Sequence, residues 1–230
     1  MLDVLREEKK YRLTLDSANY LFSKMSQVLH GDPYNGLDYY MVRSLYFDSI
    51  YDRDFFEKYQ GMEYRKKIRL RVYRADSDSA KLEMKEKCGS AQRKRSLTVS
   101  KEDALELIAG RYECLLNYSE DIASEFYYIM TTELYQPRCV VEYKRRAFAT
   151  QENSIRITFD SELVSNEGYF NIFDPNLPVY PITPKDEVLL EVKYNNFLLS
   201  YIKDVLECVD RVETSNSKYC LARKYGMMGE

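Results

Sequence analysis

Basic side chains alternate with aliphatic ones in the run RKKIRLRVYR at residues 65–74. Ile68 and Leu70 are two positions apart, and a strand with this spacing buries one face and exposes the other. Arg69 and Arg71 fall on the second face, where guanidinium groups can form paired hydrogen bonds with phosphate oxygens. The run therefore predicts either an ordinary solvated strand or one wall of an anion-binding tunnel.

The positive charge of the chain is concentrated in one segment. Residues 65–101 contain 13 Lys or Arg and 4 Asp or Glu, a local balance of +9, whereas the whole chain of 230 residues has a net charge of −3. A basic block inside an acidic chain indicates a site for an anionic ligand rather than a generally adhesive surface. The overall charge gives no reason to expect a nucleic acid partner, and none is predicted.

The histidine and cysteine content of this chain limits the chemistry that it can carry out. His30 is the only histidine, which excludes His-based catalytic triads and zinc sites with several imidazole ligands. The five cysteines include no CxxC pair, and with no secretory signal they indicate free thiols in a reducing, cytoplasmic compartment. The apolar runs are shorter than the roughly 20 residues needed to span a bilayer. Any chemistry must therefore use carboxylates, lysine, arginine and tyrosine.

Eight segments have the composition and alternation of strands, and few helices lie between them. The expected strands cover residues 7–15, 40–48, 65–74, 80–87, 93–99, 138–150, 154–163 and 187–194. The expected helices cover residues 16–31, 51–61, 100–110, 122–134 and 198–209, with a last turn or short helix over 217–226. Ser100 begins a capping box that ends at Asp103. This order predicts one α+β domain over residues 1–230, built as an antiparallel barrel or sandwich with helices packed outside.

Charged and tyrosine side chains repeat at every second position on most of these strands. The residues that share a face are Glu83, Lys85 and Lys87; Tyr143 and Arg145; Glu191 and Lys193; and Ser154, Arg156, Thr158 and Asp160. On a single strand this pattern usually means a solvated face. Repeated over several strands, it also fits a barrel whose aliphatic faces pack outward against helices and whose interior is polar. Cations that face inward repel one another, and a polyphosphate would supply the missing negative charge.

Eight short motifs follow one another along the chain: EEKKY, SLYFDSIYDRDFFEKYQG, KIRLRVY, LEMKEK, EYKRRAF, SIRITFDSEL, LLEVKY and SKY. In this order they closely resemble the catalytic domain of the vacuolar transporter chaperone (VTC) family, from about residue 6 to residue 225. The resemblance implies the triphosphate tunnel metalloenzyme (CYTH-like) superfamily, whose fold is an antiparallel eight-stranded β-barrel with a basic lining and helices outside. It also implies a polyphosphate polymerase that transfers the γ-phosphate of ATP to a growing inorganic polyphosphate chain, with Mn²⁺ or Mg²⁺ as the divalent metal.

The resemblance further implies a role for particular residues. The expected catalytic residues are Lys10, Arg69, Arg71, Lys85, Arg145, Arg156 and Lys193; the expected phosphate-binding residues are Lys94, Tyr143, Ser217 and Lys218; and the expected metal ligand is Glu191. The motif around Lys94 aligns loosely, so Arg93 and Arg95 stay alternatives at that position. Only Glu8-x-Lys10 remains of the ExExK motif of related tunnel enzymes, which argues against a two-metal hydrolase.

Two other functions stay open at this point. A tripolyphosphate or nucleoside-triphosphate phosphohydrolase would need a base or a second metal carboxylate, for which Glu83 and Asp160 are candidates. A non-catalytic polyphosphate-binding module would use the same cations. The sequence shows neither the N-terminal helical sensor domain nor the transmembrane segment of some eukaryotic relatives. The expected location is therefore cytoplasmic, at the inner face of a membrane if a membrane-protein partner carries the product across.

Overall fold

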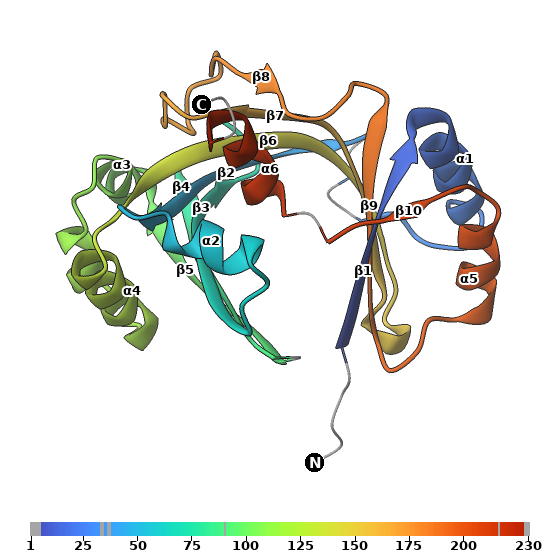
Figure 1. Cartoon of the computed structure of the whole chain (residues 1–230), viewed down its shortest axis with the longest axis horizontal. Helices are drawn as coiled ribbons and strands as arrows, with labels where there is room; N and C mark the ends of the chain where they lie inside the picture. The colour runs from blue at the N-terminus through green and yellow to red at the C-terminus, as the bar shows by residue number, and fades with distance from the viewer. Residues whose placement is uncertain (1–5, 33–34, 36–37, 90, 216, 228–230) are drawn as a thin grey trace. The chain divides into compact units, whose positions relative to one another are not determined.

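The computed structural model describes residues 6–32, 35, 38–89, 91–215 and 217–227, which form ten strands and six α-helices (Figure 1). The strands are β1 (Arg6–Thr14), β2 (Tyr40–Ser49), β3 (Tyr64–Val72), β4 (Ser79–Cys88), β5 (Ala91–Ser100), β6 (Tyr135–Ala149), β7 (Arg156–Asn166), β8 (Tyr180–Pro181), β9 (Glu187–Asn195) and β10 (Val212–Glu213). The helices are α1 (Leu15–Met25), α2 (Arg53–Tyr59), α3 (Lys101–Ile108), α4 (Asp121–Thr132), α5 (Ser200–Glu207) and α6 (Lys218–Met227). The α+β class and the antiparallel strand pairing confirm the sequence prediction.

The predicted closed barrel of eight strands differs from what the described strands form. They follow one hydrogen-bonded order, β10-β1-β9-β7-β6-β2-β3-β4-β5, with β8 beside β7. Within the described residues, β10 and β5 at the two ends of this order do not pair with each other. The unexpected strands β8 and β10 are each two residues long, and such short segments have no periodicity that a sequence could reveal.

The chain divides into two compact units, each assembled from three segments. The first unit comprises Met1–Met41, Tyr143–Leu163 and Thr183–Asn216, and the second comprises Val42–Glu142, Val164–Ile182 and Ser217–Glu230. Strands β2, β6 and β7 each contribute residues to both units. The single domain expected over residues 1–230 stays a prediction.

In the first unit, α1 and α5 cover one face of the strands β1, β9 and β7 (Figure 1). α1 begins after Thr14, whose hydroxyl accepts a hydrogen bond from the backbone N–H of Ser17 at 3.2 Å. Its buried side chains Ala18, Leu21 and Met25 recur at three- and four-residue spacing, which places them on one stripe of the helix. They pack against the apolar residues Leu13, Ile155, Ile157, Phe159, Val188, Leu190 and Val192, all but Ile155 in strands. The alternate residues of the same strands therefore form a polar face that α1 and α5 leave uncovered.

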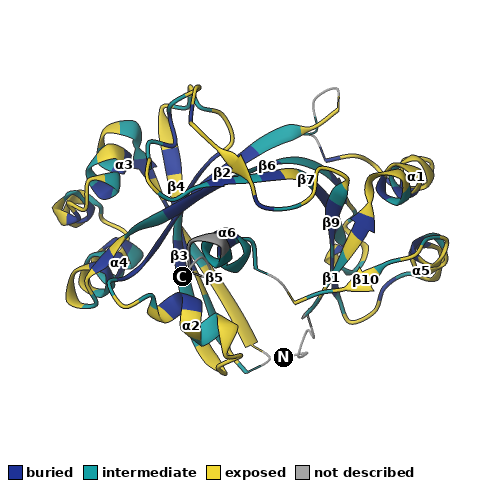
Figure 2. Ribbon diagram, turned by 45° about the horizontal axis from the view of Figure 1, so that its top comes forward, coloured by how far each residue is buried: buried dark blue, intermediate teal, exposed yellow. Residues whose placement is uncertain are grey.

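In the second unit, β2, β3, β4 and β5 form an antiparallel meander with its aliphatic face buried (Figure 2). Ile68 and Leu70 are fully buried in a core that includes residues of α3 and α4. α3 begins after Ser100, whose hydroxyl accepts a hydrogen bond from the backbone N–H of Asp103 at 3.1 Å, as the capping box predicts. The arginines that alternate with Ile68 and Leu70 therefore lie on the face away from α3 and α4.

Two predicted boundaries shift in the first unit. The helix expected over residues 16–31 ends at Met25, and Val28, within the expected range but beyond the helix, is 53% exposed. The strand expected from Ser154 begins at Arg156, because Asn153 and Ser154 have positive φ angles of 50° and 47°. Ser154 therefore does not share the strand face of Arg156.

Candidate functional site

The polar face of β3, β4 and β5 gathers positive charge around one carboxylate. The strand register places Arg69 opposite Glu83, and Lys85 opposite Lys94. Five of the basic residues on this face are here named the cationic cluster: Lys67, Arg69, Arg71, Lys85 and Lys94. The register also places Arg65, Lys81 and Lys87 on this face. Within the cationic cluster, all except Lys67 were predicted site residues. Lys67 is the first residue of KIRLR and alternates with Arg69 and Arg71 at two-residue spacing, so this signal was available in the sequence.

Glu83 is the counter-ion of the cationic cluster and is 2% exposed. Its Oε2 lies 2.7 Å from Arg69 Nε and 3.8 Å from Arg71 Nη1, and its Oε1 contacts Lys94 Nζ. Burial opposes ionisation of Glu83, but the three cations outweigh it and lower the pKa of the carboxyl to about 2. The side chain is therefore a carboxylate at neutral pH and a weak base.

The stability of the fold is expected to depend on Glu83 as the pH falls below about 5. The folded-state pKa of about 2 lies below the ordinary value of 4.5, so ionisation stabilises the fold above pH 4.5, and this contribution is lost towards pH 2. The contribution is on the order of 3 kcal/mol in the free energy of unfolding. In urea unfolding, the difference between wild type and Glu83→Gln should shrink by about half between pH 5 and pH 3. A difference that stays constant over this range would contradict the pairing of Glu83 with the cluster.

Lys94 and its two alternatives, Arg93 and Arg95, lie on different faces of β5. Arg95 lies on the helix-covered face, where its Nη2 is 2.8 Å from Glu86 Oε2 and its guanidinium also contacts Glu125 of α4. Arg93 stands opposite Glu86 in the register and shares that face. Lys94, between them, lies on the polar face and contacts the buried carboxylate of the cationic cluster.

Two hydroxyl groups of β2 extend the cationic cluster. Arg71 Nε donates a hydrogen bond to Ser44 Oγ at 3.1 Å, and Arg69 Nη1 lies 3.4 Å from Tyr46 Oη. Burial alone would raise the pKa of Tyr46, but the charges of Arg69, Lys67 and Arg71 outweigh it and lower the pKa. Ser44 and Tyr46 were not predicted as site residues, although they alternate in the predicted strand over residues 40–48.

The predicted residues Ser217 and Lys218 stand at the beginning of α6. Lys67 Nζ donates a hydrogen bond to Ser217 Oγ at 2.6 Å, so Ser217 directly adjoins the cationic cluster. Lys218 is the first residue of α6 and is partly buried.

In the first unit, two lysines and two glutamates of β1 and β9 form a second group, here named the lysine–carboxylate cluster. The register places Lys10 opposite Glu191, and Glu8 opposite Lys193. Lys10 Nζ lies 3.0 Å from Glu8 Oε1 and 3.8 Å from Glu191 Oε1, while Lys193 Nζ lies 3.1 Å from Glu191 Oε1 and 3.9 Å from Glu8 Oε2. Burial lowers the pKa of Lys193, although both carboxylates oppose this change.

Two arginines of the first unit are each paired with a buried carboxylate. Arg145 donates hydrogen bonds to both oxygens of Asp160, at 2.6 and 2.7 Å, and its Nη2 lies 3.3 Å from Tyr143 Oη. Burial alone would lower the pKa of Arg145, but the carboxylate of Asp160 raises it well above its usual value. Arg156 Nη2 donates to Asp32 Oδ2 at 2.6 Å.

The predicted cations of the first unit are therefore each paired with a carboxylate. The predicted cations are Lys10, Arg145, Arg156 and Lys193, and the carboxylates that contact them are Glu8, Asp32, Asp160 and Glu191. The excess of positive charge expected from the sequence lies in the cationic cluster of the second unit, where five basic side chains share a strand face with Glu83.

The oxygen atoms around Glu191 fit a divalent metal that is also bound by phosphate. Among the residues that the structure describes, no group of three or more His, Cys, Asp or Glu could hold a metal ion. A magnesium-type ion bound to substrate phosphates needs only one or two protein carboxylates, which Glu8 and Glu191 supply. Thr158 stands opposite Glu191, and its buried Oγ1 has no hydrogen-bond partner among the described residues. Two carboxylates and an unpaired hydroxyl are suitable ligands for Mg²⁺ or Mn²⁺.

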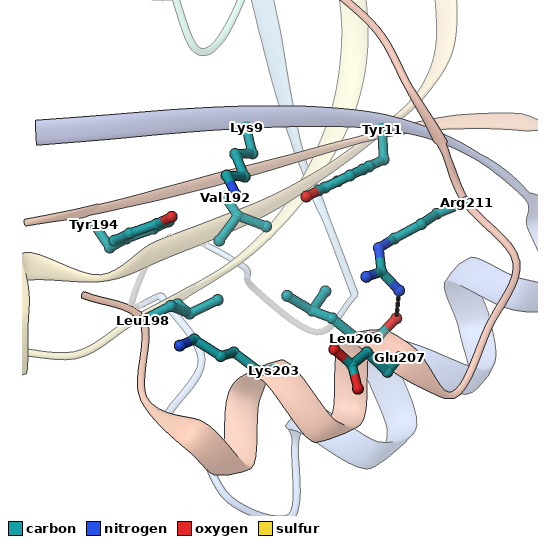
Figure 3. A pocket seen from close by; sticks show the side chains of 9 residues that line it. All are labelled: Lys9, Tyr11, Val192, Tyr194, Leu198, Lys203, Leu206, Glu207 and Arg211. Atoms are coloured by element: carbon teal, nitrogen blue, oxygen red, sulfur yellow. Dashed lines mark hydrogen bonds between the residues drawn. The ribbon is translucent and has the colours of Figure 1, made fainter.

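A pocket of about 160 Å³ lies on the helix-covered face of the first unit (Figure 3). Its lining comprises Lys9, Tyr11, Val192, Tyr194, Leu198, Lys203, Leu206, Glu207 and Arg211. Lys9 and Tyr11 flank Lys10 along β1, so the pocket and the lysine–carboxylate cluster are on opposite faces of the strand. None of the predicted site residues lines this pocket.

Comparisons with known proteins show what the sequence and the fold are similar to. The sequence pattern of the VTC domain matches residues 5–226. The fold is similar to that of bh2851 from Bacillus halodurans, described as a candidate adenylate cyclase, with a TM-score of 0.54 and 12% identity over 93% of this chain and 96% of that chain. PH1819 from Pyrococcus horikoshii OT3 has a TM-score of 0.50 and 12% identity over 96% of this chain and 99% of that chain. At this identity the likeness concerns the fold alone. No curated protein matches the sequence.

Proposed function

Because the chain belongs to the VTC domain family, we propose that it is a metal-dependent polyphosphate polymerase that transfers the γ-phosphate of ATP to a growing inorganic polyphosphate chain. The observation that carries the proposal is the cationic cluster, in which five basic side chains share a strand face with the buried carboxylate of Glu83, and that carboxylate contacts three of them. Such an excess of positive charge suits a ligand with several phosphate groups.

The cationic cluster has the side chains that phosphoryl transfer requires. Charge in the transition state spreads over the oxygens of the transferred group, and neutralising that charge supplies most of the catalysis. Arg69 and Arg71 are proposed to hold these oxygens with their planar forks. Lys85 and Lys94 are proposed to contact neighbouring phosphates as point charges. Within the protein, no covalent intermediate is needed.

The first unit is proposed to supply the metal ligands and further phosphate contacts. Glu191, together with Glu8, would hold the divalent metal, and the metal when bound adds positive charge to phosphate oxygens. Lys10, Lys193 and Arg156 are proposed to bind phosphate oxygens. Tyr143 and Arg145, linked by a hydrogen bond, are proposed to do the same, as are Ser217 and Lys218 in the second unit.

Growth of a chain needs no protein base, which favours the polymerase over the hydrolase. The terminal phosphate of an acceptor chain is ionised at neutral pH, since its last pKa is about 6. Water, by contrast, must lose a proton to a base or to a metal-bound hydroxide. Both candidate bases act as counter-ions: Glu83 contacts three cations, and Asp160 accepts two hydrogen bonds from Arg145.

The proposed location and partners rest on the sequence. Over the part of the chain that the structure describes, no helix has both the length and the apolar composition needed to cross a membrane. A cytoplasmic location, a membrane-protein partner and the lack of a nucleic acid partner stay predictions.

The function is tested by incubating the purified protein with ATP and either Mn²⁺ or Mg²⁺ and separating the products by gel electrophoresis. We expect a ladder of phosphate chains that disappears when a chelator removes the metal. Free phosphate without any chain would identify a hydrolase instead. Binding of tripolyphosphate without turnover of ATP would identify a binding module.

A further inference from the structure

Tyr219 connects the C-terminal helix α6 to the strand β2 through a buried hydrogen bond. The side chain has no exposed surface, and its hydroxyl donates to Asp48 Oδ2 at 2.6 Å. Tyr219 is the last residue of the SKY motif, and Asp48 belongs to the motif that begins SLYFDS. The function proposed above gives a role to Ser217 and Lys218 of the SKY motif but none to Tyr219.

Asp48 is a junction between three elements. Its Oδ1 accepts hydrogen bonds from the backbone N–H groups of Ser49 at 2.7 Å and Asp54 at 2.9 Å, and its Oδ2 accepts from Phe55 at 2.9 Å. These bonds join the end of β2 to the first turn of α2, and the hydroxyl of Tyr219 adds α6. A buried carboxylate with four donors has a defined orientation, because any displacement would leave a buried charge unpaired.

The ring of Tyr219 also has defined contacts. It stacks on Tyr46 with ring centroids 5.2 Å apart and an interplanar angle of 28°, and it meets Phe55 edge-on at 6.3 Å. Lys67 Nζ lies 5.4 Å from the Tyr219 ring centroid, within reach of a cation–π contact, and bonds to Ser217 Oγ. The anchored tyrosine thus lies two residues from the serine that contacts the cationic cluster.

We infer that Tyr219 and Asp48 are positioning residues that hold Ser217 and Lys218 beside Lys67, so that these three side chains bind phosphate as one group. The inference rests on the proposed function, because it assigns a phosphate-binding role to the beginning of α6. Lys67 is thereby a further phosphate-binding residue, which the family resemblance did not indicate.

The test removes the hydroxyl of Tyr219 and keeps its ring. Tyr219→Phe is expected to raise the Kd for tripolyphosphate, measured by titration calorimetry, about fivefold to tenfold. The KM for ATP should rise by a similar factor, while kcat changes less than about twofold. Amide hydrogen exchange of residues 218–224 should accelerate, whereas that of β3 should not. Asp48→Asn weakens the same bond from the other side and should also raise the Kd, but it disturbs the backbone bonds of β2 and α2 as well, so its melting temperature should fall further than that of Tyr219→Phe.

Two comparisons separate positioning from general stability. Tyr112→Phe removes another buried hydroxyl of the same unit, which donates to the carbonyl oxygen of Tyr135 at 2.7 Å. It should lower the melting temperature by a similar amount and leave the Kd unchanged. In the Ser217→Ala/Lys218→Ala background, adding Tyr219→Phe should weaken binding no further, because its effect acts through these two residues.

The outcomes distinguish this inference from the function on which it rests. Failure of the wild type to bind tripolyphosphate would overturn the proposed function and the inference together. Normal wild-type binding with an unaffected Tyr219→Phe would overturn the inference alone. The same holds if Tyr219→Phe weakens binding equally with and without Ser217 and Lys218.

Discussion

Replacing Glu191 by glutamine is expected to reduce ATP turnover by about 100-fold or more, while tripolyphosphate binding persists or tightens. The amide keeps the shape of the side chain but lacks the negative charge that a hard divalent cation requires. The negative charge of Glu191 also repels phosphate, so the neutral amide of glutamine removes this repulsion and favours anion binding. Turnover is measured on a product gel, Mn²⁺ affinity by titration calorimetry, and tripolyphosphate affinity in the absence of metal.

Glu187→Gln provides the matched control for this change. Glu187 belongs to the same strand, and its carboxylate lies 3.8 Å from the guanidinium of Arg12. We expect Glu187→Gln to keep both its Mn²⁺ affinity and its turnover. Full activity in Glu191→Gln would reject the metal role and leave Glu191 as an ion-pair partner of Lys10 and Lys193.

Removing the two arginines of β3 is expected to weaken tripolyphosphate binding by about 100-fold or more. A charge-assisted hydrogen bond is worth roughly 1.5 to 3 kcal/mol, and Arg69→Ala/Arg71→Ala loses at least two such bonds. The same change leaves Glu83 buried with fewer cations, so the melting temperature should fall as well. Titration calorimetry below the melting temperature of the variant separates the two effects.

Arg95→Ala is the control for the loss of a partly buried arginine. Arg95 lies on the opposite face of β5, where it pairs with Glu86 and Glu125. Its removal should lower stability without changing tripolyphosphate affinity. If the double variant changes the binding free energy by less than about half a kcal/mol, its arginines are solvated surface residues and the phosphate-binding role is wrong.

The faces of individual strands could be predicted because their period of two is local. Ile68 and Leu70 are buried and Arg69 and Arg71 lie on the other face, as the alternation in β3 indicates. The same reasoning placed the polar residues of β9 correctly relative to its aliphatic ones. The cap of α3 at Ser100 was predictable for a similar reason, since its partner is three residues away.

Pairing between distant segments was not predictable in this way. Asp32 and Arg156 are 124 positions apart, and only the fold brings their side chains together. Which carboxylate pairs with each predicted cation of the first unit depends on such contacts, so the sequence alone could not show it. Closure of a barrel likewise depends on which strands pair at the two ends of the sheet order, and no strand carries that information by itself.

If the cationic cluster binds phosphate as proposed, the buried carboxylate of Glu83 affects which anions it accepts. Any phosphate that approaches Arg69, Arg71 and Lys94 competes with a resident anion for the same donors. A single orthophosphate must displace these contacts with only one group, whereas a longer chain can reach Lys67 and Lys85 at the same time. Under the proposed function, Glu83 would therefore favour longer phosphate chains over monomeric phosphate, by electrostatic competition rather than by a steric barrier.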